Sequence, residues 1–246
     1  MSKLTGKVSI ITGASRGIGR AIALDFAKEG ASIVINYSKD DDGANETLNL
    51  VKDLGSTGIL IKEDVSTYEG AERIVNETIK HFGKIDILVN NAAKSTIGLF
   101  MDSSKEEINN IISTNLLGPM YLSKLVIPHM LGKEGIILNI SSIWGEAGAS
   151  CEVGYSTTKG GINLFTKALA KEMAPSNIRV NAIAPGVIET KMNSFLSEED
   201  RKELEEEIPM GRFGLPEEVA KTATFLCSKD SSYITGQIIK VDGAIL

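Results

Sequence analysis

The sequence of 246 residues contains only two cysteines and two histidines. Cys151 and Cys227 are too few for a disulfide framework, and their spacing matches no metal-binding motif. With so few thiol and imidazole groups a zinc site is unexpected, and we predict that the protein uses no metal. Such sparse cysteine usage fits the reducing cytoplasm, and we predict a cytoplasmic location.

Long apolar runs and an excess of positive charge are also missing. No run of about 18 apolar residues suggests a membrane span. The N-terminus passes from Lys3 and Lys7 into the strand-like segment 8–11, which lacks the pattern of a signal peptide. A net charge of −6 provides no basic stripe to neutralise phosphates. We therefore expect neither a membrane nor a nucleic acid as a partner.

The sequence does contain a regular alternation of short β-branched runs with amphipathic stretches. Apolar residues make up 42% and charged residues 24%, as in ordinary globular proteins. The runs are nearly uninterrupted Ile, Val and Leu, which is typical of parallel strands buried on both faces. With helices between them they predict one α/β domain over residues 1–246, built on a doubly wound parallel sheet. The predicted strands are Val8–Thr12, Ser32–Asn36, Gly58–Glu63, Ile85–Asn90, Ile136–Ser141, Arg179–Ala184 and Ile238–Val241.

One compositional break interrupts this pattern. The segment Ser197–Ile208 is rich in Glu and Lys and lies between Gly186 and Pro209. We predict a helical flap over a substrate within residues 187–212, and a solvated surface helix is the alternative.

A glycine-rich loop follows the first predicted strand and opens a helix. It reads Thr12-Gly13-Ala14-Ser15-Arg16-Gly17-Ile18-Gly19. Gly13, Gly17 and Gly19 let the backbone turn tightly and approach a pyrophosphate, whose charge then faces free N–H groups at the helix N-terminus. We predict a dinucleotide site that includes Ser15 and Ile18, and a plain strand-to-helix turn is the alternative.

The residues after the second strand indicate which nucleotide binds. In many NAD-binding sheets an acidic residue there holds the ribose hydroxyls, but this chain has Tyr37 in the corresponding place. Arg16, with Ser38 or Lys39, can bind a 2′-phosphate through charge and hydrogen bonds. NADP(H) is therefore favoured over NAD(H).

Asp64 and Val65, at the end of the third strand, are candidates for contacts with the adenine ring. A carboxylate can accept from the adenine amino group, and an aliphatic side chain can cover the ring. A helix N-cap near Ser66 is an equally good interpretation.

Tyr155 and Lys159 are four residues apart in a predicted helix. Residues i and i+4 share a helix face, so the Lys159 ammonium would lie beside the Tyr155 phenol and lower its pKa. Such a phenol can act as an acid near neutral pH. A half-buried aromatic residue with a lysine that extends to solvent is the alternative.

Three further pieces fall at the carboxyl ends of predicted strands, where ligands of open α/β sheets bind. They are Asn90-Asn91-Ala92-Ala93, Ser141-Ser142 and Pro185-Gly186. With the glycine loop, Asn115 and the 13-residue step from Ser142 to Tyr155, they resemble the short-chain dehydrogenase/reductase family across essentially the whole chain. The resemblance implies a Rossmann-type three-layer sandwich around a seven-stranded parallel sheet.

The resemblance also implies roles for individual residues. Tyr155 would protonate a carbonyl oxygen as hydride arrives from the nicotinamide, and Ser142 would hydrogen-bond the same oxygen. Lys159 would hold the nicotinamide ribose, and Asn115 would support a water-linked proton path. In isolation, Ser142 can also be interpreted as a helix cap and Asn115 as a hydrogen bonder within a helix. Further cofactor contacts would come from Asn91, Ala92, Pro185, Gly186, Ile188 and Thr190.

Within the family, the chain is most similar to 3-oxoacyl-acyl-carrier-protein reductases of bacterial fatty-acid synthesis. The similarity lies in the glycine loop, Ile188-Glu189-Thr190 and Ile208-Pro209-Met210-Gly211-Arg212. It implies NADPH-dependent reduction of a 3-oxoacyl thioester to the 3-hydroxyacyl thioester. Lys133 and Ser176 stand where those reductases have arginines that bind an acidic carrier protein, and Ala93 replaces a glycine.

Two other functions remain open. The segment 141–153 resembles that of enzymes that reduce an aminopentanone attached to a lysine of a translation elongation factor. In this segment Trp144 either walls a substrate pocket or lies in the core, and Cys151 is expected to be small, buried and apolar. An NADP(H)-sensing regulatory protein is a remote alternative, because all the residues needed for turnover are present.

Family members pair their long crossover helices around two-fold axes, here about Lys105–Met130 and Tyr155–Met173. The resemblance therefore implies a homotetramer, with a dimer as the alternative.

Overall fold

The computed structural model describes residues 2–191 and 196–246. Residues 192–195, which belong to the predicted flap, lie outside the described residues. The strands begin and end within two residues of the predicted positions, because each is a run of β-branched and aliphatic residues. They are β1 (Val8–Thr12), β2 (Ser32–Tyr37), β3 (Gly58–Lys62), β4 (Ile87–Asn90), β5 (Gly135–Ile140), β6 (Ile178–Pro185) and β7 (Ile238–Val241).

All seven strands form one parallel sheet in the order β3-β2-β1-β4-β5-β6-β7. The prediction of a doubly wound, Rossmann-type sheet is confirmed. The order reverses between β1 and β4, because the chain winds outward first in one direction and then in the other. The chain therefore continues from these two strands to helices on opposite faces of the sheet, and such folds have a crevice at this point of the carboxyl edge.

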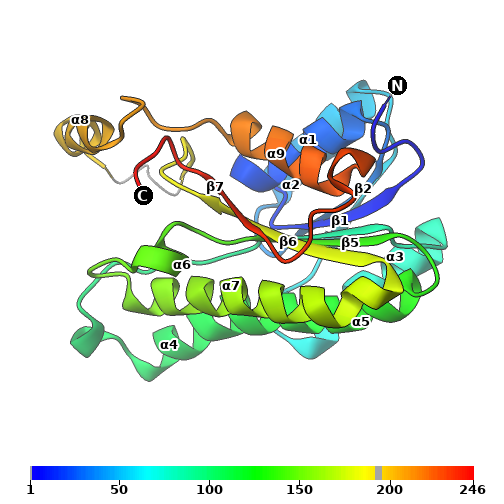
Figure 1. Ribbon diagram of the computed structural model, residues 1–246, viewed down its shortest axis with the longest axis horizontal. Helices are drawn as coiled ribbons and strands as arrows, with labels where there is room; N and C mark the ends of the chain where they lie inside the picture. The colour runs from blue at the N-terminus through cyan, green and yellow to red at the C-terminus, as the bar shows by residue number, and fades with distance from the viewer. Residues whose placement is uncertain (1, 192–195) are drawn as a thin grey trace.

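Helices cover both faces of the sheet (Figure 1). Apolar clusters join them to it, with Phe26 and Val219 in one cluster and Ile74 and Leu122 in the other. Burying one such side chain stabilises the fold by about 1.5–3 kcal/mol. The first face carries α1 (Gly17–Lys28), α2 (Asp41–Asp53) and α9 (Pro216–Cys227). The second face carries α3 (Tyr68–Phe82), α4 (Lys105–Ile112), α5 (Gly118–Met130) and α7 (Val153–Met173).

The predicted long helix Lys105–Met130 is interrupted by a π-helical turn at Ser113–Leu117, between α4 and α5. A π-turn is a local widening of a helix and is frequent at functional sites. Immediately after it, a Cβ at Gly118 would lie 2.8 Å from the carbonyl oxygen of Val65. Glycine is therefore needed where this helix passes close to the loop after β3.

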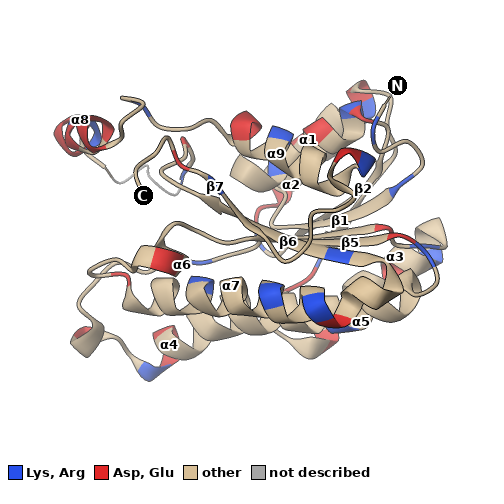
Figure 2. Ribbon diagram, viewed as in Figure 1, with Lys and Arg blue, Asp and Glu red and all other residues tan. Residues whose placement is uncertain are grey.

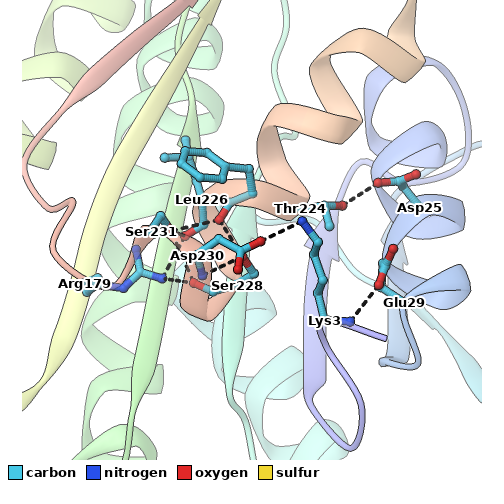
Figure 3. A network of polar contacts seen from close by, with 10 residues as sticks. Lys3, Asp25, Glu29, Arg179, Thr224, Leu226, Ser228, Asp230 and Ser231 are labelled. Atoms are coloured by element: carbon cyan, nitrogen blue, oxygen red, sulfur yellow. Dashed lines mark hydrogen bonds and ion pairs between the residues drawn. The ribbon is translucent and has the colours of Figure 1, made fainter. Parts of the chain in front are cut away.

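A polar network fixes the last helix and the N-terminus to the sheet (Figure 3). Arg179 of β6 donates to the carbonyl oxygens of Leu226 and Ser228 at 2.8 and 3.1 Å, which satisfies acceptors at the end of α9. Nζ of Lys3 donates to Asp230 at 2.6 Å. Arg179 stands near the start of β6, so the network stiffens the edge of the sheet opposite the crevice.

Candidate active site

A cavity of about 880 Å³ opens at the carboxyl edge of the sheet. It brings together residues from the loops after successive strands and from the first turns of α7. Gly19 and Asn115 are the predicted site residues that do not line it, among the described residues. The predicted residues in the lining are Gly13, Ser15, Arg16, Gly17, Ile18, Tyr37, Ser38, Asp64, Val65, Asn91, Ala92, Ser142, Tyr155, Lys159, Pro185, Gly186, Ile188 and Thr190.

The glycines of the loop after β1 are required for two different reasons. Gly13 and Gly17 have φ of +63° and +55°, a region that favours glycine. A Cβ at Gly19 would lie 2.5 Å from Nδ2 of Asn91 and 2.5 Å from the carbonyl oxygen of Gly13. The Asn91 amide donates to the carbonyl oxygens of Thr12 and Gly13 at 2.8 and 3.1 Å. Asn91 therefore ties the loop after β4 to the glycine loop, and Gly19 leaves room for it.

The glycine loop fits the pyrophosphate of a dinucleotide. Arg16 occupies the N-cap position of α1, but its side chain does not cap the helix. Its Nε lies 3.4 Å from Oδ2 of Asp40 instead. The first N–H groups of α1 thus remain available to an anion, toward which the helix N-terminus contributes a favourable field. Arg20 supports the loop by donating to the Ser15 carbonyl oxygen at 2.7 Å.

The residues proposed for a 2′-phosphate, Arg16, Ser38 and Lys39, lie together in the lining. Asp40 lies there too, pairs with Arg16, and caps α2 by accepting from the Gly43 N–H at 3.1 Å. Asp40 lies three residues beyond the end of β2 and was not predicted as a site residue. We call the part of the cavity around these four residues the nucleotide end. It contains both the proposed phosphate ligands and a carboxylate that competes with a phosphate for Arg16.

Tyr37 takes the place of the missing acid, and its hydroxyl turns away from the lining. The hydroxyl donates to Oδ1 of Asp41 at 2.9 Å, and Asp41 pairs with Lys62 at 2.6 Å. Burial and the bond to Asp41 raise the pKa of Tyr37. Tyr37 therefore contributes a neutral ring to the nucleotide end.

Asp64 and Val65 line the cavity beside this end. The Asp64 carboxylate accepts from the Ser66 N–H at 2.9 Å, while the N-cap of α3 is Thr67. The helix cap thus lies one residue beyond Ser66, and Asp64 forms the turn that leads into it. Burial raises the pKa of Asp64, but the hydrogen bonds from Ser66 outweigh this and the net pKa is lowered. The carboxylate is therefore ionised and able to accept.

Tyr155, Ser142 and Lys159 come together farther along the sheet, beyond β5. Nζ of Lys159 lies 5.4 Å from the centroid of the Tyr155 ring, as expected for residues four apart in a helix. Ser142 is close enough to the Tyr155 phenol to lower its pKa, and Oγ of Ser142 accepts from the Trp144 N–H at 3.2 Å. Lys159 is buried and donates to the carbonyl oxygen of Ile140 at 2.7 Å. Two hydroxyl groups and one ammonium thus share one part of the cavity.

Both ionisable groups of this centre have shifted pKa values. Burial raises the pKa of Tyr155 to about 12, the bond with Ser142 acts in the opposite direction, and the charge of Glu152 adds to the increase. Burial lowers the pKa of Lys159 to about 8. The prediction of a lowered Tyr155 pKa is therefore wrong, because burial is the largest influence on the phenol. Tyr155 is protonated at neutral pH, which is the form that a proton donor needs.

Asn115 lies within the π-turn and holds the loop after β4. Its Oδ1 accepts from the Lys94 N–H and its Nδ2 donates to the Lys94 carbonyl oxygen, both at 2.8 Å. Nδ2 also lies 3.3 Å from Oγ1 of Thr158 in α7. Asn115 therefore connects the loop to the helix that carries Tyr155. Ala93 fits beside this clamp without strain, since the described non-glycine residues with positive φ are Cys151, Asn177 and Ala244.

Some residues of the lining were not predicted as site residues. Oγ of Ser95 donates to Oε2 of Glu152 at 2.7 Å, and both side chains line the cavity. Glu152 precedes Tyr155 by three residues, and residues three apart at the start of a helix can face the same side. This spacing could have indicated that Glu152 lines the same cavity as Tyr155. Trp144 is half-buried in the lining, which favours its interpretation as a pocket wall over a core residue.

The segment after β6 forms one side of the cavity. α8 (Glu198–Glu207) is the helix expected in the flap, and Leu196 and Leu204 line the cavity. Arg201 pairs with Glu189 and so ties α8 to the segment after β6. Acidic residues make up most of α8 (Figure 2), whose sequence holds seven acidic and two basic residues. This segment therefore presents leucines to the cavity and acidic residues to solvent.

Within residues 2–191 and 196–246, no group of three or more His, Cys, Asp or Glu side chains could hold a metal ion. No helix in this part of the chain is long and apolar enough to cross a membrane. Cys227 is buried, and burial raises its pKa to about 12. Cys151, expected to be buried, is partly exposed instead, because it lies in the turn before α7 with φ of +63°.

Similar proteins share the whole length of this chain. A family model described as enoyl-(acyl carrier protein) reductase matches residues 13–244. Glucose 1-dehydrogenase 2 of Bacillus subtilis is 41% identical, over 98% of this chain and 95% of that protein. The 3-oxoacyl-[acyl-carrier-protein] reductase FabG of Aquifex aeolicus is 41% identical, over 99% and 98%. YmfI, an uncharacterized oxidoreductase of B. subtilis, is 38% identical, over 96% and 98%.

Solved structures share the fold closely. A short-chain dehydrogenase/reductase variant from Serratia marcescens has a TM-score of 0.94 at 31% identity and covers 99% of both chains. A dinucleotide cradle beside a tyrosine and a serine hydroxyl defines an oxidoreductase that uses a nicotinamide cofactor and acts on an alcohol or a ketone. The chain belongs to the short-chain dehydrogenase/reductase family.

Proposed function

We propose that the protein is an NADPH-dependent carbonyl reductase in which Tyr155 is the proton donor. The observation that carries the proposal is that Tyr155 and Ser142 lie close together in the lining of the cavity that also contains the glycine loop. Both hydroxyl groups can donate to one carbonyl oxygen while the glycine loop binds the pyrophosphate of the cofactor. In this proposal residues 1–246 act as one domain, with residues 187–212 as the substrate flap.

The chain's own residues handle the proton, and the bound cofactor supplies the hydride that reduces the carbonyl carbon. Tyr155 donates its proton to the carbonyl oxygen, and Ser142 polarises the same oxygen through a hydrogen bond. Lys159 offsets the charge of the resulting phenolate and binds the nicotinamide ribose. Asn115 fixes the loop after β4, and we assign to it the support of a water-linked path that returns a proton to Tyr155.

The proposed preference for NADP(H) depends on Arg16. Arg16→Ala is expected to raise the KM for NADPH about tenfold and the KM for NADH less than about twofold, because a charge-assisted bond to phosphate contributes about 1.5 kcal/mol. Steady-state kinetics with each cofactor measures both values. Lys28→Ala removes the same charge from the exposed far end of α1 and serves as the control. Equal effects of Arg16→Ala on the two cofactors would refute the phosphate site.

The first substrate that we propose is a 3-oxoacyl thioester, reduced to the 3-hydroxyacyl thioester. Support comes from the similarity to 3-oxoacyl-[acyl-carrier-protein] reductases of A. aeolicus and Thermotoga maritima, at 41% and 40% identity. The test is the rate of NADPH oxidation with acetoacetyl groups on acyl carrier protein and on coenzyme A, each with an NADH control. Faster turnover of the carrier-bound group is expected. Absence of turnover with both, while NADPH still binds, would exclude this substrate.

A second candidate is an aminopentanone attached to a lysine of a translation elongation factor. Trp144 and Glu152 give the cavity an aromatic wall and a negative charge, which suit a substrate that carries an amine. Lys133 and Ser176 replace the arginines that bind an acidic carrier, and the acidic α8 lies beside the cavity. These features oppose the approach of an acidic partner. Steady turnover of any ketone would exclude the remaining alternative, an NADP(H)-sensing protein without activity.

We also propose a homotetramer, with a dimer as the alternative. Support comes from exposed apolar side chains on the crossover helices, namely Ile112, Met120 and Leu164. Clustered exposed apolar residues mark protein interfaces. Light scattering of the purified protein distinguishes the two assemblies from a monomer, and a monomeric mass would refute both.

A further inference from the structure

One acidic side chain of the cavity, that of Glu152, lies near Tyr155, where the carbonyl group of a substrate would bind. The acids at the ends of β2 and β3, which are Asp40, Glu63 and Asp64, belong to the nucleotide end. Glu152 instead lies in the turn before α7, three residues from Tyr155. Its partner is the neutral hydroxyl of Ser95 at 2.7 Å. The ion pairs between described residues do not include Glu152.

The field of a helix N-terminus favours an acid at this position, but Glu152 does not cap the helix with its side chain. Glu152 occupies the N-cap position of α7, where Ser, Thr, Asp or Asn is preferred because a short side chain accepts from the first N–H groups. The carboxylate of Glu152 is directed to Ser95 across the cavity wall instead. The residue is half-buried in the lining, so it does not contribute a core contact either. Its position has a consequence for ligands rather than for the helix.

One hydrogen bond, from Ser95, orients the carboxylate, and a second bond joins the backbone beside it. In the second, the Gly98 N–H donates to the Cys151 carbonyl oxygen at 2.9 Å. The loop after β4 and the turn before α7 are thereby joined at Glu152 and at the residue before it. The charge of Glu152 also acts on the phenol of Tyr155, although burial is the larger influence there. The carboxylate is therefore near enough to the reacting centre to influence a bound substrate.

Two cations of the lining, Arg16 and Lys159, have partners other than Glu152. Lys159 donates to a carbonyl oxygen of β5, and the charges of Lys39 and Lys94 act on Asp64. Arg16 pairs with Asp40, and Lys191 in the flap has a partner of its own. The negative charge of Glu152 is thus left for a ligand, and the acidic surface of α8 has the same sign.

We infer that Glu152, oriented by Ser95, is a specificity-determining residue that selects ligands with a positive charge, ketones among them, and disfavours those with a carboxylate. The inference rests on the proposed carbonyl reduction, because it concerns the substrate of that site. One helical turn separates Glu152 from Tyr155, about 5 Å along the axis, so a chain of a few carbons can connect a carbonyl at Tyr155 to a cation at Glu152. Inside a partly enclosed cavity such a charge pair is screened less than in bulk water.

Three ketones that share the chain CH₃–CO–(CH₂)₃– test the inference. The chain ends in trimethylammonium, in tert-butyl or in carboxylate, and the first two ends have nearly the same shape but differ in charge. With NADPH and the wild-type protein, we expect kcat/KM to fall about tenfold from the ammonium to the tert-butyl ketone. A further fall of about tenfold is expected for the carboxylate.

Glu152→Gln is expected to reduce each of these ratios to less than about threefold, because the amide keeps the shape and removes the charge. Glu146→Gln is the matched control: it removes the same charge from an exposed residue of α6 (Trp144–Ala147) outside the lining, and should keep both ratios. Ser95→Ala should give intermediate ratios, since it releases the carboxylate without removing it. An unchanged ammonium-to-tert-butyl ratio in Glu152→Gln would overturn the inference.

Binding separates this inference from the proposed function. Trp144 is the single tryptophan of the chain and lines the cavity, so its fluorescence reports occupancy without turnover. We expect the Kd of pentyltrimethylammonium to rise about tenfold in Glu152→Gln, and the Kd of hexanoate to fall. If these shifts occur while neither the three ketones nor the acetoacetyl thioesters are reduced, the proposed reduction is wrong and the role of Glu152 in binding stands. Equal Kd values in wild type and variant would overturn that role even if the ketones are reduced.

Discussion

Tyr155→Phe is expected to lower kcat about a thousandfold while the Kd for NADPH changes less than about twofold. The substitution removes the hydroxyl group that Ser142 contacts and that would protonate the carbonyl oxygen, but it keeps the ring. General acid catalysis by a positioned group contributes about 10²–10⁴-fold, and Ser142 alone can polarise the oxygen without replacing the proton. Single-turnover absorbance of NADPH gives the rate of reduction, and a fluorescence titration gives the Kd.

Tyr233→Phe is the matched control, because Tyr233 is fully exposed and lies outside the cavity lining. It should leave both quantities unchanged. If Tyr155→Phe kept more than about a tenth of wild-type kcat, the proton would come from another group and the assignment of Tyr155 would be wrong. A large change in the NADPH Kd would instead show that the ring position had moved.

The strands were the most predictable part of the fold, because burial on both faces makes each strand a nearly continuous apolar run. The errors lie at the ends and have local causes. β5 begins at Gly135, one residue before the predicted start. The backbone of this glycine pairs with Ile178, but glycine has no side chain that would extend the apolar pattern of the strand. Backbone pairing therefore sets the strand boundary, and side-chain patterns only approximate it.

The π-turn at Ser113–Leu117 could not be predicted from apolar spacing. Its residue Asn115 bonds the backbone of Lys94, 21 residues earlier in the chain, and Thr158, 43 residues later. Contacts of this kind leave no periodic pattern in the segment itself. The sequence indicated Asn115 through a family resemblance, but not the loop that it holds.

The candidate site was predictable where geometry dictates the residue type. The positive φ of Gly13 and the close approach at Gly19 both require glycine, so the sequence displays these constraints directly. The i to i+4 spacing likewise predicted that Tyr155 and Lys159 lie next to each other. It did not give the direction of the Tyr155 pKa shift, because that depends on how deeply the surrounding loops bury the phenol.

Lys159→Met is expected to lower kcat about a hundredfold. Methionine keeps the apolar stem but removes the ammonium that offsets the phenolate left when Tyr155 gives up its proton. Burial lowers the pKa of Lys159 to about 8, so the charged form is lost above that pH. The wild-type kcat/KM should therefore fall as the pH rises above about 8, and the smaller kcat/KM of the variant should not show this fall. A pH series of initial rates for both proteins measures the difference.

The same buried charge predicts an opposite pH dependence of stability. The ordinary pKa of a lysine side chain is 10.5, so between pH of about 8 and 10.5 the unfolded chain holds a proton that the folded protein has released. The contribution of Lys159 to the free energy of unfolding therefore rises with pH across this window, by about 3 kcal/mol. Below pH of about 8 the lysine is charged in both states, and the cost of burying it stays constant.

Urea unfolding of wild type and Lys159→Met across this pH window measures that contribution as a difference between the two free energies of unfolding. Lys167→Met, on the exposed face of the same helix, should give a difference that is flat with pH. A flat difference for Lys159→Met as well would show that water reaches the ammonium and that its pKa is not depressed. A rise in stability together with a fall in activity over one pH range would show that the charge needed for proton transfer destabilises the fold that buries it.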